Sequence, residues 1–237
     1  MQELFFNDKQ LSAKLRNSLT EPRLTRYIKA CGDDSLAVLP MYYWNCQLSQ
    51  SLYILTHTWE VGVRNRLNSF LCWKYGKQWP FDEARAVRQL SNTDKHRLRE
   101  AIDRQRQRRK TSVVSTDAVV ADLSAGFWVS LLGKSYDVPF SWRYNLARVL
   151  PHDATIDRAE ASKICDDLLD LRNRIAHHEP IFHLPLENVK ADADRLLAAM
   201  CPAIHRFASS TCTFQLIMTQ KPHISLASPV NSPTSKI

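Results

Sequence analysis

The sequence predicts an all-α fold, and three observations support this prediction. Glycine accounts for only 5 of the 237 residues, which leaves few of the tight turns that a protein of many short strands needs. Apolar residues recur at steps of three and four, the spacing that places them on one face of a helix. No stretch alternates apolar and polar residues as a half-buried strand does.

Two long helices carry the clearest patterns. The proline-free stretch 41–79 has an apolar stripe formed by Leu52, Leu55, Trp59, Val63, Leu67, Phe70 and Leu71. A second helix is expected from about Thr155 to His178, where Pro180 ends it because proline lacks an N–H group. Its apolar face comprises Ile156, Ala159, Ile164, Leu168, Leu171 and Ile175.

Shorter helices are predicted elsewhere. They are expected over residues 11–30 (one or two helices), 92–110, 116–132 and 186–207. Thr20 and either Ser91 or Asn92 are the expected N-caps. Residues 32–35 are expected to form a turn, and residues 134–140 a loop.

The predicted organisation is one helical domain with two appendages. Residues 1–36 form an N-terminal helical segment, residues 37–208 form the helical domain, and residues 209–237 form a tail. The tail is rich in Ser, Thr, Pro and Lys and has little periodicity, so we expect it to be disordered. A chain of 237 residues is long enough for one good-sized core.

The net charge of +8 and pI of about 9.3 fit a polyanionic partner such as nucleic acid. A solvated basic surface would give the same excess. The densest basic cluster ends the predicted helix 92–110, and its candidate RNA-binding residues are Arg104, Arg106, Arg108 and Arg109. Basic residues also suit a helix C-terminus through the helix dipole, so this alternative stays open.

The six cysteines form no CxxC pair, and we expect a reducing, cytoplasmic location without disulfide bonds. The N-terminal residues lack a basic region followed by an apolar run, so no signal peptide is expected. No stretch is long and apolar enough to span a bilayer, so no membrane partner is expected.

The stretch LRNRIAHHEPIF, residues 171–182, is the candidate functional site. Asn173 and His177 are four residues apart and share a helix face, with Arg172 beside them. His177 lies in the last turn, where the helix dipole favours the imidazolium form. An arginine and an imidazolium together suit a phosphate. In the alternative interpretation His177 only caps the helix and Arg172 pairs with a nearby aspartate: Asp166, Asp167 or Asp170.

The chemistry that such residues suit is RNA cleavage. RNA supplies its own nucleophile, the 2′-OH, so the protein need only move protons and stabilise charge on phosphorus. No metal or other cofactor is expected. His177, His178, His183 and Glu179 do not have HExxH spacing, and adjacent histidines point to different sides of a helix.

Two segments carry a resemblance to a known family. Arg172-Asn173-x-x-x-His177 resembles the R-polar-x-x-x-H motif of the HEPN superfamily, and the wider string resembles its Abi-like (abortive infection) branch. The segment TWEVGVRNRLNSFLCWKYGKQW, residues 58–79, is similar to the N-terminal signature of that branch. Its E-x-x-x-R-N positions are held by Glu60, Arg64 and Asn65. The resemblance covers most of residues 40–207.

The resemblance implies an HEPN-like bundle of long antiparallel helices whose motif helices meet across a homodimer. It implies a metal-independent endoribonuclease, acting in phage defence or as a toxin. His177 would then be the general acid/base, Arg172 would bind the phosphate and Asn173 would orient them. Supporting roles fall to Glu60, Arg64, Asn65, His178 and Glu179.

The partners implied are RNA, a second copy of the chain, and an antitoxin or a phage-derived trigger. Some HEPN toxins carry tyrosine two residues after the motif histidine, where a nucleotidyltransferase partner modifies them, but this chain has Glu179 there. A non-catalytic RNA- or nucleotide-binding interaction module remains the alternative, followed by a plain helical scaffold. The tryptophans at positions 59, 73, 79 and 128 are expected in the core rather than as base-stacking platforms.

Overall fold

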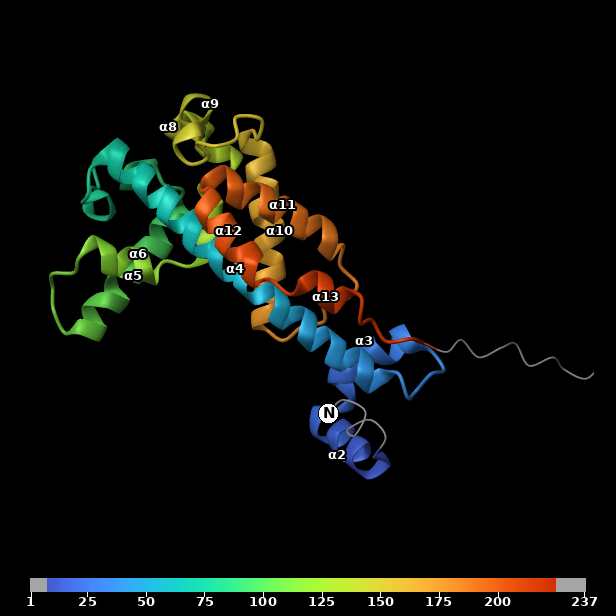
Figure 1. The fold of residues 1–237 in the computed structure, drawn as a ribbon. Coiled ribbons are helices and arrows are strands. Elements are labelled where there is room, and N and C mark those ends of the chain that lie inside the picture. The colour runs from blue at the N-terminus through green and yellow to red at the C-terminus, as the bar shows by residue number, and fades with distance from the viewer. Residues whose placement is uncertain (1–7, 225–237) are drawn as a thin grey trace, which may run out of the picture. The chain divides into compact units, whose positions relative to one another are not determined.

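The computed structural model describes residues 8–224, and within that range it contains helices and turns but no strand (Figure 1). The prediction of an all-α fold is therefore confirmed. No helix among these residues combines the length and apolar character needed to cross a membrane.

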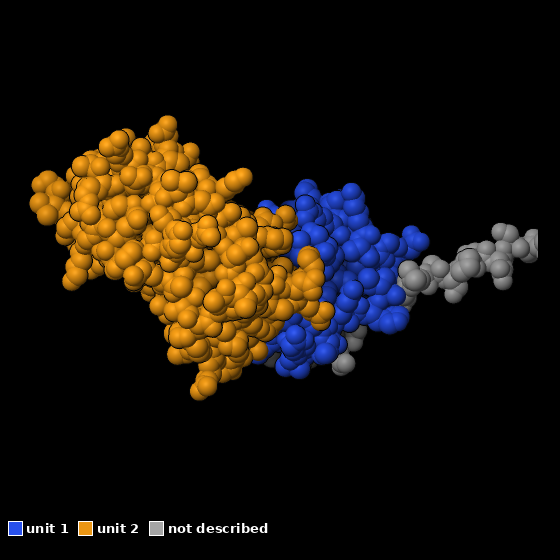
Figure 2. Space-filling view, turned by 90° about the horizontal axis from the view of Figure 1, so that it is seen from above, with its two compact units in different colours: residues 1–52, 178–184, 213–237 blue, residues 53–177, 185–212 orange. Residues whose placement is uncertain are grey.

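The chain divides into two compact units (Figure 2). The described part of unit 1 comprises residues 8–52, 178–184 and 213–224, and unit 2 comprises residues 53–177 and 185–212. One division between the units falls inside a continuous helix, and another falls directly after His177.

Unit 1 contains three short helices and the beginning of a long one. They are α2 (Lys9–Leu19), α3 (Glu21–Cys31), α13 (Phe214–Met218) and the first part of α4 (Val38–Tyr75). Asn45, which is buried, accepts hydrogen bonds from the backbone N–H groups of Ile181 (2.7 Å) and Phe182 (3.2 Å). The buried Tyr27 ring packs 5.3 Å from the Phe182 ring. Residues 178–184 are thereby fixed within unit 1.

Unit 2 contains the rest of α4 and most of the other helices. These are α5 (Asn92–Arg109), α6 (Thr116–Asp122), α7 (Ala125–Ser130), α8 (Asp137–Phe140), α9 (Trp142–Asn145), α10 (Arg158–Ala176), α11 (Leu186–Met200) and α12 (Pro202–Thr211). Short 3-10 turns occur at Trp79–Phe81, Val87–Gln89, Lys134–Tyr136 and Leu146–Arg148. Helix α10 packs against both α7 and α11.

The two long helices follow the predicted patterns closely. All seven residues of the predicted α4 stripe are buried. In α10, Ile164, Leu168 and Leu171 are buried as predicted. Ile175 is only half-buried, however, and Ala159 is exposed, with Ala161 in the core instead. Helix α10 begins at Arg158 rather than Thr155 because the Asp157 side chain caps it, accepting a hydrogen bond from the Glu160 N–H at 2.8 Å. It ends at Ala176, two residues before the predicted end.

Four other predictions are corrected by the structure. The expected helix 116–132 is two helices, because Ser124 caps a new one by accepting from the Phe127 N–H. Residues 134–140 form a 3-10 turn and α8 rather than a loop. The expected helix 186–207 breaks at Cys201, before Pro202. The expected disordered tail includes the end of α12 and all of α13, whereas residues 225–237 lie outside the described residues.

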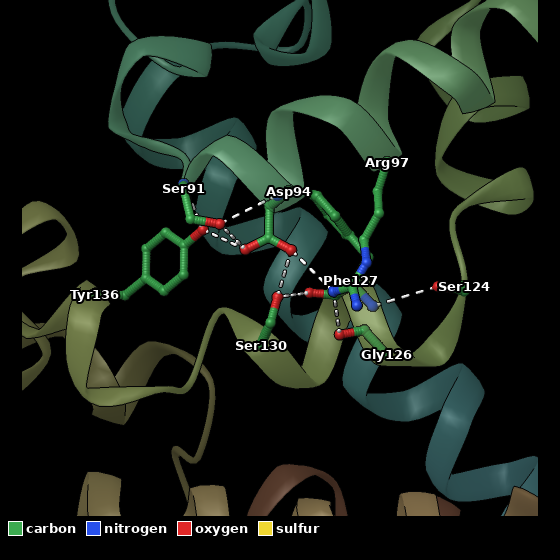
Figure 3. A network of polar contacts seen from close by, with 8 residues as sticks. All are labelled: Ser91, Asp94, Arg97, Ser124, Gly126, Phe127, Ser130 and Tyr136. Atoms are coloured by element: carbon green, nitrogen blue, oxygen red, sulfur yellow. Dashed lines mark hydrogen bonds and ion pairs between the residues drawn. The ribbon is translucent and has the colours of Figure 1, made fainter.

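A buried carboxylate ties three parts of unit 2 together (Figure 3). Asp94 of α5 is 2% exposed. It accepts hydrogen bonds from Ser91 (2.7 Å), Ser130 (2.9 Å), Tyr136 (2.6 Å) and Arg97 (3.0 Å). Burial and the bond to Asp94 raise the pKa of Tyr136 to about 12. Because a buried charge is tolerated only when it is paired and hydrogen-bonded, this network fixes α5 against α7 and the following turn.

Three of the four tryptophans lie in the core as predicted, at positions 59, 79 and 128. The prediction is wrong for Trp73, whose side chain is 52% exposed. The Arg148 guanidinium lies 3.6 Å from the centre of the Trp73 ring, a cation–π contact that covers one face of it.

Candidate functional site

The end of α10 positions the predicted motif. His177 is the C-cap, and its backbone N–H donates to the Asn173 carbonyl at 2.9 Å. The next residue, His178, has a φ of +58°, a left-handed conformation that stops the helix. Within unit 1, the His178 carbonyl accepts a hydrogen bond from Arg23 Nη1 at 2.7 Å. The structure therefore shows a role for the His178 backbone, which turns the chain at the end of α10.

Arg172 pairs with a residue of the other predicted signature. Its Nε lies 3.0 Å from Glu60 Oε2, and its Nη1 donates to Asn173 Oδ1 at 3.3 Å. The Arg172 and Glu60 side chains are 39% and 30% exposed. An ion pair of this exposure fixes geometry more than it adds stability. Glu60 and Arg172 are 112 residues apart in the sequence. Their contact therefore brings together, within unit 2, the two segments that carry the family resemblance.

The alternative pairing of Arg172 with a nearby aspartate is not what the structure shows. Asp170 instead pairs with Arg174 at 3.1 Å, and Asp167 pairs with Lys163 at 2.7 Å. Both pairs join residues four apart along α10. Arg172 is thereby left to Glu60 of α4.

A pocket of about 270 Å³ lies beside this ion pair within unit 2. It is lined by Tyr53, Thr56, His57 and Glu60 of α4 and by Arg172, Ile175 and Ala176 of α10. Sequence reasoning missed Tyr53 and His57. Their spacing from Glu60, at steps of four and three, places them on the same face of α4 and could have identified them.

His177 and Glu179 are not among the residues that line the pocket. His177 is exposed at the end of α10, one turn beyond Asn173. Glu179 is half-buried in unit 1. The structure therefore brings together Arg172, Asn173 and Glu60, but it does not bring His177 into the pocket.

The remaining residues of the first signature make a local contact. Arg64 Nε donates to the side chain of its neighbour Asn65 at 3.2 Å. A glutamate and an arginine four residues apart can pair along a helix, but Glu60 is paired with Arg172 instead.

The basic end of α5 is largely paired with carboxylates. Arg104 Nε lies 2.7 Å and Arg108 Nη1 lies 3.6 Å from Asp122 of α6. Although burial raises the pKa of Asp122, hydrogen bonds from Arg104 and Gln105 and the charge of Arg108 hold it below its usual value. Of the other two candidate RNA-binding residues, Arg106 pairs with Asp103 at 3.3 Å and Arg109 donates to the Gln105 amide at 3.2 Å.

Among residues 8–224, no three His, Cys, Asp or Glu side chains are grouped so that they could hold a metal ion. Comparison with known proteins gave no matching family model, no matching curated protein and no matching solved structure.

Proposed function

We propose that this chain is a metal-independent endoribonuclease of the HEPN type that acts in phage defence or as a toxin. The observation that carries the proposal is the Arg172–Glu60 ion pair. It joins, beside a pocket, the two segments that resemble the Abi-like branch. Such a meeting would be a coincidence if either resemblance arose by chance.

In this proposal the chemistry is transesterification by the 2′-OH of RNA. Arg172, oriented by Glu60 and Asn173, binds the phosphate and stabilises the charge that develops on its oxygens. His177 transfers the proton, either from the 2′-OH or to the leaving oxygen. The exposure of His177 leaves its ring accessible to RNA.

The proposal includes a homodimer, as the resemblance implies. His177 does not line the pocket that holds Arg172, so a site assembled from two copies would supply the histidine that one pocket lacks. The further partners proposed are an antitoxin or a phage-derived trigger, in the cytoplasm.

The alternative function is a non-catalytic RNA- or nucleotide-binding interaction module. The same ion pair is compatible with it, because a carboxylate beside Arg172 lowers the ability of the guanidinium to stabilise charge in a transition state. Such a module would need Arg172 and the pocket but not the imidazole of His177. The histidine therefore separates the two functions.

The decisive experiment measures RNA cleavage in excess EDTA. The wild-type protein is expected to cut single-stranded RNA and leave 2′,3′-cyclic phosphate ends, and His177→Ala is expected to abolish cleavage. His152→Ala, at another exposed histidine of unit 2, is the matched control and should cleave normally. If His177→Ala cuts RNA as fast as the wild type, the mechanism is wrong. If the wild type binds RNA without cutting it, the alternative function is favoured.

A further inference from the structure

The pocket beside Arg172 has two chemically different parts. Tyr53 and His57 present aromatic rings from α4, whereas Arg172 and Glu60 form a charged part. Tyr53, His57 and Glu60 follow one another at steps of four and three, so one face of α4 carries both the rings and the carboxylate.

The two rings are arranged as a stacked pair. Their centroids lie 6.0 Å apart and their planes are inclined by 28°. Tyr53 is 60% exposed, and His57 is also exposed. Most aromatic residues of unit 2 are instead buried, including Trp59 only two residues further along α4. Exposed, stacked rings at a pocket wall offer an aromatic face to a flat ligand.

In the charged part of the pocket, two nitrogens of the Arg172 guanidinium are held by neighbouring side chains and the third is not. Arg172 uses Nε toward Glu60 and Nη1 toward Asn173. Within residues 8–224, no side chain or carbonyl accepts a hydrogen bond from its Nη2. A guanidinium held in this way keeps donors for a phosphate oxygen and loses little further freedom on binding.

We propose that this pocket is a nucleotide subsite for single-stranded RNA, in which one base stacks on the rings of Tyr53 and His57 and the adjoining phosphate meets Arg172. The volume of about 270 Å³ lies just below the roughly 300–1,000 Å³ of pockets for drug-sized ligands, which suits one base. A base can enter only when it is unstacked from its neighbours, so the subsite selects single-stranded RNA over duplex.

The subsite adds substrate selection to the proposed function and rests on it for the choice of RNA as ligand. A base held next to Arg172 sets which phosphate lies at the guanidinium. Cleavage would then fall beside an unpaired base rather than at random along the chain.

The test measures binding separately from cleavage. The probe is a fluorescein-labelled single-stranded RNA of ten nucleotides with 2′-fluoro sugars, which lack the 2′-OH nucleophile. Tyr53→Ala is expected to raise Kd about tenfold, because stacking of one base on an aromatic ring has roughly this effect. Tyr53→Trp should bind within about twofold of the wild type, because it keeps an aromatic face.

Two further variants show whether the effect belongs to the pocket. Tyr144→Ala, at a tyrosine of unit 2 that is 78% exposed and outside the pocket lining, should leave Kd unchanged. Arg172→Gln should weaken binding and lower the slope of log Kd against log salt by about one phosphate contact. Circular dichroism of each variant checks that the helices are intact.

The outcomes separate this inference from the proposed function. The subsite is disproved if the wild type does not bind the probe, if Tyr53→Ala binds as the wild type does, or if Tyr144→Ala loses as much affinity. Tyr53-dependent binding without any cleavage of natural RNA would retain the subsite and overturn the nuclease. His177-dependent cleavage with no effect of Tyr53→Ala would retain the nuclease and overturn the subsite.

Discussion

Two regions of unit 2 pair arginine with a carboxylate, and they do so in different ways. At the end of α10, Arg172 meets Glu60, with one arginine to one carboxylate and both side chains about a third exposed. At the end of α5, Arg104 and Arg108 both meet Asp122, whose side chain is only 10% exposed. The first pair lines a pocket, whereas the second joins α5 to α6.

The difference shows that a dense run of arginines in the sequence can be engaged largely in contacts within the fold. The sequence from Arg104 to Arg109 is the most basic in the chain, but two of its four candidate arginines hold Asp122 in the fold. Arg172 lies in a stretch of mixed charge, and within residues 8–224 its Nη2 has no hydrogen-bond acceptor. The comparison predicts that one region controls activity and the other controls stability.

The largest expected effect is a loss of RNA cleavage in the Arg172→Ala variant. Losing one oriented donor to the phosphate should reduce the cleavage rate about 10²- to 10³-fold. The free energy of unfolding should change by less than about 1 kcal/mol, because the pair is partly exposed. Single-turnover cleavage and urea unfolding measure the two quantities.

Arg104→Ala is the matched variant at the other region. It should cleave RNA within about twofold of the wild type and lose about 1 kcal/mol of stability, because Asp122, whose side chain is 10% exposed, loses one donor. Equal losses of cleavage in the two variants would contradict the contrast between the regions.

Much of the fold could be predicted from the sequence because periodicity reports which face of a helix is buried. The α4 stripe was correct at every residue, from Leu52 to Leu71. Errors arose where a local hydrogen bond decides the outcome. The cap that Ser124 gives to α7 is one such bond, and apolar periodicity does not distinguish two capped helices from one continuous helix.

The site could be predicted only in part, because sequence spacing describes one helix at a time. Arg172 and Asn173 share a local contact, as their adjacency suggests. The partner of Arg172 lies on α4, and no rule of local spacing links position 172 to position 60. Likewise Trp73 follows the period of a buried residue, yet it is exposed and covered on one face by Arg148 of a distant segment.

The second-largest expected effect is a loss of stability in the Asp122→Asn variant. This variant tests the contact between the end of α5 and α6. The pKa of Asp122 is lowered in the folded state, so the unfolded chain binds the proton more readily. The stabilising effect of the charged carboxylate is therefore full above its ordinary pKa of about 3.9 and disappears as the pH falls through the lowered value. At pH 7 the variant should lose about 1–3 kcal/mol.

Urea unfolding of wild type and Asp122→Asn between pH 7 and pH 3 measures this difference. It should be constant down to about pH 5 and decrease below about pH 4. Asp103→Asn is the control, because Asp103 pairs with Arg106 on the surface of α5 and should change stability by less than about 0.5 kcal/mol. A difference independent of pH would show that the Asp122 charge is not what stabilises the α5–α6 contact.

The smallest effect is expected for Glu60→Gln, which tests the region around the Arg172–Glu60 pair. Glutamine keeps an oxygen that can accept from Arg172 but removes the charge that holds the guanidinium in place. The KM for RNA should stay equal or fall, because the pocket becomes more positive, whereas kcat should fall about fivefold as Arg172 becomes less well oriented. Stability should change by under about 1 kcal/mol.

Glu83→Gln, at a surface pair with Arg99, is the control and should change neither KM nor kcat. If Glu60→Gln leaves kcat unchanged, Glu60 does not position Arg172, and the ion pair is no more functional than the pairs at Asp122.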